Sequence, residues 1–187
     1  SEFIENIDIA RATPVILSNY LQYEKANSLA SKSPDIAAEW HPSRNGYVTP
    51  EMVSYASGRK VWWLGKCGHE WEAVIRSRAA GAGCPYCSHN RVLAGFNDLD
   101  YLFPKVAQEW STANLPLLPW QVTAYANTKV WWICEKGHEW EALISTRSYG
   151  SQCPYCSGIK VLPGYNDLAT LNPVLAAEWH PTKNKPL

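Results

Sequence analysis

The sequence predicts a small α+β fold class in which one unit, a β-hairpin with short helices, is repeated in tandem. Three short segments each return 69 residues later: VWW at 61–63 and 130–132, GHEWEA at 68–73 and 137–142, and CPYCS at 84–88 and 153–157. One offset shared by three segments indicates that a whole structural unit is duplicated. Ten tryptophans in 187 residues predict small cores built around indole rings.

A flanking element extends the repeat. The sequence Ala-Ala-Glu-Trp-His-Pro occurs at 37–42 and 176–181, a related segment lies at 106–110, and each follows a proline. Asn-Asp-Leu at 97–99 and 166–168 marks the junctions. The third repeat stops before any cysteine, as in a fragment or an array that ends in a half-repeat. We therefore predict four segments: an N-terminal helical lead over 1–26, a first repeat over 27–96, a second over 97–165, and the start of a third, incomplete repeat over 166–187.

Short helices are expected in the flanking elements. Ser33-Pro34 and Asn172-Pro173 each combine a capping residue with proline at the first helical position. The helices are expected to run through the Glu-Trp pairs until His41-Pro42 and His180-Pro181 end them. Apolar spacing over Pro14–Tyr23 predicts a helix in the lead.

Each repeat is expected to hold one hairpin. Val61–Leu64 and Val130–Ile133 are β-branched and aromatic, which favours strands. Glu70–Ile75 and Glu139–Ile144 are the predicted partner strands, because a glycine precedes each of them at the turn. Alternation along a strand directs one tryptophan of each VWW inward and the other outward. Five further tryptophans are expected in the core: Trp40, Trp71, Trp110, Trp140 and Trp179.

The six cysteines fall three to each half of the chain: Cys67, Cys84, Cys87, Cys134, Cys153 and Cys156. Three cysteines cannot pair completely within one unit, which disfavours a disulfide framework. A histidine lies near each trio. This arithmetic favours a bound metal and a reducing, cytoplasmic setting.

The second repeat has the spacing of a structural zinc site. Cys134 and His138 are separated by three residues, and Cys153 and Cys156 by two. Zinc takes four sulfur or nitrogen ligands, usually as two close pairs from separate segments. We predict that these four side chains bind one zinc ion and fix the hairpin against the Cys-Pro-Tyr-Cys turn.

The first repeat departs from this pattern, because Gly65 stands where the second repeat has Cys134. The predicted ligands are Cys67, His69, Cys84 and Cys87, which gives two zinc ions per chain. Residues two apart on an extended strand face the same way, so Cys67 and His69 can reach one ion. Two alternatives stay open: the hairpin is shifted by two residues, or His69 only packs and another group completes the site.

The motifs resemble a zinc-ribbon or treble-clef repeat family found in tandem arrays in bacterial proteins. The resemblance covers nearly everything from Asn27 onward. It implies a treble-clef-like hairpin and helix around zinc, and nucleic-acid binding, sometimes beside restriction-type nuclease domains. Gly65 and Cys67 depart from the family pattern. The matching residues are Trp131-Trp132, Cys134, GHEW at 137–140, Arg147, CPYC at 153–156, the junction at 161–168 and the AAEWHP segment at 176–181.

Basic residues recur at three positions of both repeats: Lys60 and Lys129, Arg78 and Arg147, and Arg91 and Lys160. Next to tryptophan or tyrosine, such clusters are expected to contact a nucleic-acid backbone, DNA rather than RNA. The alternative is a protein-interaction scaffold, because the formal net charge is zero and the lysines and arginines can pair with nearby glutamates.

Enzyme classes are disfavoured, and we expect neither catalysis nor a small-molecule substrate. Cys-Pro-Tyr-Cys resembles a glutaredoxin motif, but it occurs twice, each time with a Cys/His pair upstream. His89-Asn90 suggests a His-Asn-His-type nuclease, but Gly158-Ile159 stands at the equivalent position. His41, His89 and His180 lack partners at ligand spacing and are expected at the surface or in caps. No apolar run approaches the ~20 residues of a membrane span.

Overall fold

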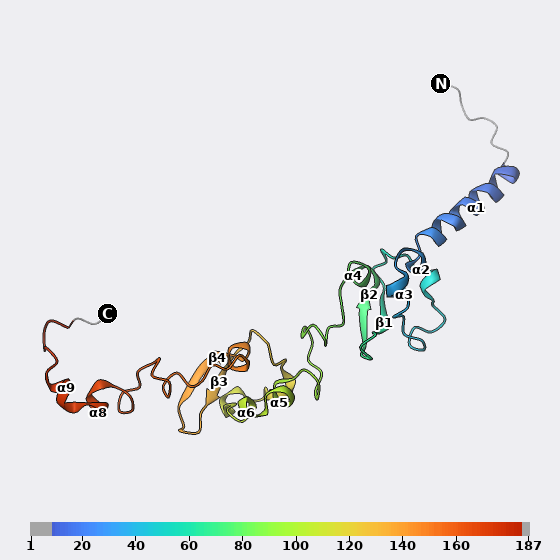
Figure 1. The fold of residues 1–187 in the computed structure, drawn as a ribbon. Coiled ribbons are helices and arrows are strands. Elements are labelled where there is room, and N and C mark those ends of the chain that lie inside the picture. Colours follow the sequence, from blue (N-terminus) through green and yellow to red (C-terminus); the bar gives the residue numbers. More distant parts are fainter. Residues whose placement is uncertain (1–8, 185–187) are drawn as a thin grey trace. The chain divides into compact units, whose positions relative to one another are not determined.

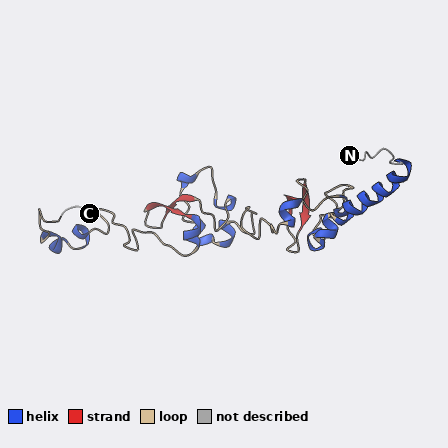
Figure 2. Ribbon diagram, turned by 90° about the horizontal axis from the view of Figure 1, so that it is seen from above, coloured by secondary structure: helices blue, strands red, loops and turns tan. Residues whose placement is uncertain are grey.

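The computed structural model describes residues 9–184 and divides the chain into two compact units, Ser1–Ser88 and His89–Leu187. Each unit contains one two-stranded antiparallel sheet surrounded by short helices (Figures 1 and 2). None of the helices in the described part of the chain is long and apolar enough to cross a membrane.

Both units contain, in the same order, a pair of short helices, 3-10 helix, a hairpin and a further short helix. The first unit contains α1 (Ile9–Ala26), α2 (Leu29–Lys32), α3 (Pro34–Ala37), the 3-10 helix η1 (Pro50–Met52), β1 (Lys60–Leu64), β2 (Glu70–Val74) and α4 (Ile75–Ala79). The second contains α5 (Leu99–Leu102), α6 (Pro104–Ala107), η2 (Thr112–Asn114), η3 (Pro119–Gln121), β3 (Lys129–Ile133), β4 (Glu139–Leu143), α7 (Ile144–Ser148), α8 (Leu168–Leu171) and α9 (Pro173–Ala177).

Tryptophans form the centre of both hairpins. Trp63 lies opposite Trp71 across the β1–β2 pair, and Trp132 lies opposite Trp140 across β3–β4. All four side chains are buried. On the other face Trp131 is 41% exposed. The predicted alternation, with one tryptophan of each VWW directed inward, is confirmed.

A pair of short helices covers each hairpin. Trp40, just after α3, forms a bridge to Trp63, and the two rings meet edge to face at 5.6 Å between centroids. Trp110 packs on Trp132 in the same way at 5.4 Å. The indole N–H of Trp40 donates to the carbonyl of Val48 at 3.1 Å, so the buried polar end of the ring is satisfied.

The first helix of each pair (α2, α5 and α8) was not predicted, although the residue before each helix has a side chain that can cap its N-terminus. Ser28, Asp98 and Asp167 each accept a hydrogen bond from a backbone N–H in the first turn of α2, α5 and α8. Such side chains satisfy N–H groups that a helix start leaves without a partner. The Asn-Asp-Leu segment is therefore the start of a helix pair.

Two predicted boundaries are wrong. The helix after Ser33 ends at Ala37, before the Glu-Trp pair, because the following backbone pairs with β1. The carbonyl of Glu39 accepts from Leu64 N at 2.8 Å, and His41 N donates to Trp62 O at 3.1 Å. The second strand ends one residue early as well, since Ile75 begins α4. These pairings are long-range and leave no local signature.

The prediction that Trp179 lies in a core is also wrong, because its side chain is 61% exposed. Trp179 follows α9 at the position that Trp40 and Trp110 occupy after α3 and α6. In the described part of the chain no hairpin follows α9, so the ring has no strand to pack against.

Substitution of Asp98 tests the capping role. Its carboxylate is 1% exposed and accepts from Gly95 N at 2.6 Å and Tyr101 N at 2.8 Å. We expect Asp98→Ala to lower the free energy of unfolding by about 1–2 kcal/mol. Thermal unfolding of the zinc-loaded chain, followed by circular dichroism, measures this. Asp100→Ala, an exposed change in the same turn, is the control. Equal melting temperatures for the two variants would contradict the role.

Candidate metal centre

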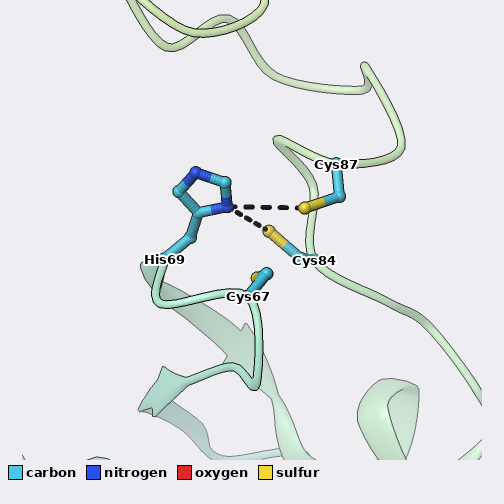
Figure 3. A group of neighbouring side chains, drawn as sticks. All are labelled: Cys67, His69, Cys84 and Cys87. Atoms are coloured by element: carbon cyan, nitrogen blue, oxygen red, sulfur yellow. Dashed lines mark hydrogen bonds between the residues drawn. The ribbon is translucent and has the colours of Figure 1, made fainter.

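The four predicted ligands of the first repeat converge at one place. Cys67 and His69 come from the turn between β1 and β2, and Cys84 and Cys87 from the turn after α4 (Figure 3). Their ligand atoms all lie within 4.8 Å of one another. Nδ1 of His69 is 3.5 Å from Sγ of Cys84 and 3.4 Å from Sγ of Cys87.

The second repeat builds the same arrangement from Cys134, His138, Cys153 and Cys156. Nδ1 of His138 is 3.5, 3.6 and 3.3 Å from the three sulfurs, in sequence order. The sulfurs of Cys134 and Cys156 are 3.9 Å apart. A tetrahedron with Zn–S bonds of about 2.3 Å and Zn–N bonds of about 2.0 Å has edges of roughly 3.5–3.8 Å. The side chains therefore fit zinc, and the two tetrads hold two ions, as predicted.

Glycine makes the ligand turn possible in both units. Gly68 and Gly137 have φ values of +80° and +79°, a region that side chains other than glycine rarely adopt. Each glycine N–H donates back across the turn, to Gly65 O at 2.9 Å and to Cys134 O at 2.8 Å. The same backbone turn therefore presents the histidine in both repeats.

The move of the cysteine from position 65 to position 67 in the first repeat does not shift the hairpin. Lys60 pairs with Val74, and Lys129 with Leu143, so the registers of the two sheets are equivalent. A Cβ at Gly65 would lie 3.1 Å from Sγ of Cys67 and 2.9 Å from the Trp71 ring. The Cys67 sulfur thus lies beside the place where a cysteine at position 65 would begin. Of the open alternatives, the structure places both Cys67 and His69 in the tetrad, on an unshifted hairpin.

The clustered thiols influence one another's ionisation. Burial, together with the neighbouring thiols, raises the pKa of Cys87 to about 11. Burial also acts to raise the pKa of Cys67 and Cys134, but hydrogen bonds, chiefly with the backbone of His69 and His138, outweigh it and lower both. Thiols this close cannot all ionise without a cation between them. Zinc binding must therefore displace protons, and zinc affinity must fall as pH falls.

Tyrosines flank the histidine ligands. Tyr86 lies edge to face with His69 at 5.5 Å between centroids, and Tyr155 with His138 at 5.7 Å. Both are the tyrosines of Cys-Pro-Tyr-Cys. In the second unit Tyr165 adds a contact with His138 at 4.2 Å, and its hydroxyl accepts from Lys136 Nζ at 3.0 Å. These rings restrict the orientation of the imidazole and shield one side of the site.

Arg78 and Arg147, two of the residues expected to contact nucleic acid, have buried side chains. Arg78 forms an ion pair with Glu39 and donates to the carbonyl of Ala82. Arg147 does the same with Glu109 and Ser151. Sequence analysis missed these two glutamates, although the Glu-Trp pair that contains them recurs in each copy.

The other recurring basic residues lie outside the core. Lys60 pairs with Glu72 at 3.0 Å and Lys129 with Glu141 at 3.7 Å, both across the exposed side of a strand pair. Arg91 and Lys160 are exposed. Of the recurring basic positions, Lys129 and Lys160 line one hollow of the second unit, together with Glu139 and Glu141.

The buried arginines support the zinc sites. The guanidinium of Arg78 lies 5.4 Å from the Trp63 ring and 5.1 Å from the Trp71 ring. It thereby joins the hairpin core, the segment after α3 through Glu39, and the loop that leads to Cys84 through Ala82. Arg147 repeats these contacts in the second unit. One side chain thus fixes the approach of the second cysteine pair.

The remaining histidines are not ligands. His41 is buried and caps a turn, one of the two roles expected for it: its Nδ1 accepts from the N–H groups of Ser43 and Arg44. His180 caps the corresponding turn in the third copy. His89 lies against the edge of the Tyr125 ring at 5.0 Å.

A family model described as a probable treble clef zinc finger domain matches residues 36–90 and 106–159, more than half of the chain. The two matched segments each contain one complete tetrad. The resemblance noted from the motifs, the tandem treble-clef fold and the two zinc ions are thereby confirmed. No curated protein matches the chain.

Substitution at positions 65 and 67 tests whether Cys67 is a zinc ligand of the first tetrad. We expect Cys67→Lys to leave one zinc per chain, since only three ligands remain in the first tetrad. The double change Gly65→Cys/Cys67→Lys should restore two, because it copies the second repeat, with a shift of the Trp71 ring. Native mass spectrometry counts the ions. Two zinc ions in Cys67→Lys alone would exclude Cys67 as a ligand.

Removal of the buried guanidinium tests its structural role. Arg147→Met leaves the carboxylate of Glu109 without its partner, and we expect a loss of about 3 kcal/mol in the free energy of unfolding. Lys129→Met, at an exposed ion pair, should cost less than about 1 kcal/mol. Urea unfolding of both zinc-loaded variants measures the difference. Similar losses would show that Arg147 is not a structural centre.

Proposed function

We propose that this chain, which belongs to the probable treble clef zinc finger family, is a non-enzymatic module that binds a protein partner through the outer faces of its hairpins. The observation that carries the proposal is the placement of the recurring cations. Two are buried in ion pairs and two are paired with strand glutamates. These four recurring cations therefore offer little positive charge to a phosphate backbone, and the formal net charge of the chain is zero.

The metal sites support a structural rather than a catalytic role. Each tetrad supplies four protein ligands, which closes the coordination shell of zinc, whereas catalytic zinc keeps one position for water or substrate. Among the described residues, the two tetrads are the only clusters of side chains suited to a metal ion. The zinc ions thus serve to hold the hairpins in place for binding.

The outer faces have the composition of a protein-binding surface. Trp131 is 41% exposed on β3, and Glu139 and Glu141 lie on the adjoining strand. Exposed tryptophan provides contact area at low entropic cost, and residues of this type dominate protein interfaces. Carboxylates beside it favour a cationic partner over an anionic one.

Nucleic acid is the second candidate, and one surface favours it. Lys129, Trp131, Tyr155 and Lys160 line a hollow of about 230 Å³, together with Glu139, Glu141 and Trp140. The Trp131 ring can stack on an unpaired base while the two lysines contact phosphates. The two carboxylates in the same hollow act against phosphate binding.

Capture experiments with the zinc-loaded chain test the proposal. We expect nuclease-treated extract to yield a protein that the wild type retains and that Trp131→Ala loses. The purified candidate should then bind the wild-type chain directly. Asp100→Ala, remote from the hairpin face in sequence, serves as the matched control and should bind as the wild type does.

Nucleic-acid binding is tested separately. Titration with duplex DNA, single-stranded DNA and RNA across a salt series should show no strong binding. Salt-dependent binding, with a slope that falls by about one on Lys160→Ala, would replace the protein partner by nucleic acid.

A further inference from the structure

The two hairpin faces differ by one cation. In the first unit the guanidinium of Arg44 lies 4.4 Å from the centre of the Trp62 ring. The same group pairs with Oε2 of Glu70 at 2.9 Å. The outer tryptophan of β1 and the first glutamate of β2 thus hold an arginine between them, through cation–π attraction and an ion pair.

The second unit has the same tryptophan and glutamate but lacks the arginine. Trp131 and Glu139 stand at the positions of Trp62 and Glu70. The segment from Trp110 to Asn114 is one residue shorter than that from Trp40 to Asn45, and the residue before its asparagine is Ala113, where the first unit has Arg44.

The next residue verifies this correspondence. The side-chain oxygen of Asn45 accepts from Trp62 N at 2.8 Å, and its Nδ2 donates to Trp62 O at 2.9 Å. Asn114 makes the same two bonds with Trp131, at 2.8 and 2.7 Å.

The two carboxylate oxygens of Glu139 can be compared one by one with those of Glu70. In the first unit Oε1 of Glu70 lies 3.3 Å from His41 Nε2, and Oε2 takes the arginine. In the second unit Oε1 of Glu139 accepts from the hydroxyl of Ser111 at 3.3 Å. No described side chain forms a hydrogen bond or an ion pair with Oε2 of Glu139. The oxygen that binds arginine in one unit is therefore open in the other.

We propose that Trp131 and Glu139 bind an arginine side chain of the partner protein, in the arrangement that Arg44 adopts within the first unit. This inference rests on the proposed function and specifies the chemistry of the partner. The planar guanidinium can stack on the indole and still donate to a carboxylate, which the ammonium group of lysine does less well.

The surroundings fit a cationic segment. Glu141 lies in the same hollow and pairs with Lys129 only at 3.7 Å. Tyr155 adds an aromatic wall, and Lys160 is the one further cation that lines the hollow. The hollow is thus lined by two carboxylates, two lysines and three aromatic residues, and its carboxylates and aromatic rings favour a guanidinium over a phosphate.

The experiment follows the indole N–H resonance of Trp131 in the zinc-loaded chain by NMR, assigned with Trp131→Phe. The probe is the peptide acetyl-Gly-Arg-Gly-amide. Its matched control carries citrulline, which has nearly the same shape as arginine but no charge. We expect saturable shifts with arginine at millimolar concentration, and binding at least about tenfold weaker with citrulline. Equal binding of the two peptides would refute the proposal.

Three variants make the test specific. Ala113→Arg should rebuild the arrangement of the first unit and abolish binding of the peptide, while zinc content stays at two. Glu139→Gln should weaken binding about tenfold, and Asp100→Ala, which lies outside the hollow, should leave it within about twofold. Undiminished binding in Ala113→Arg would overturn the site.

The outcome is separable from that of the proposed function. If a protein partner is captured through the hairpin faces but arginine does not shift Trp131, only the arginine site fails. If single-stranded oligonucleotides shift Trp131 and the peptide does not, the face belongs to nucleic acid and both proposals fail.

Discussion

Convergence of two turns on one zinc ion is the constraint on which each unit depends. The first unit has a core of seven buried hydrophobic side chains, centred on Trp63 and Trp71. Its sheet has only two strands, and isolated hairpins of that size are marginal in water. The tetrad joins the hairpin turn to the Cys-Pro-Tyr-Cys turn, so metal binding supplies stability that the core cannot.

A buried ion pair extends this constraint to the helices. Arg78 touches both core tryptophans and reaches Glu39, 39 residues earlier in the chain. It also donates to the loop before Cys84. The helix pair, the hairpin and the second half of the zinc site therefore share one side chain. Because Arg78 makes these contacts on the inner side of the hairpin, the side chains on the outer face can vary without changing them.

The two repeats show where variation is tolerated. The first repeat moves one ligand from the position of Cys134 to Cys67, and the hairpin register is unchanged. On the outer face, Arg44 covers the tryptophan of one unit, and Ala113 leaves that of the other exposed. The scaffold thus stays constant while the surface differs, which is how one duplicated unit can acquire distinct binding properties.

The sequence by itself determined the duplication, the tetrad of the second repeat, the strands and the inward tryptophans. Each of these follows from residue spacing that is local or periodic, because ligand geometry and strand alternation act over a few residues. Only the tertiary structure decided that Arg78 and Arg147 are internal, that the helices end before the Glu-Trp pairs, and that Trp179 is exposed. Those outcomes depend on partners tens of residues away, or on the absence of a hairpin after α9 in the described chain, and no local pattern encodes such distances.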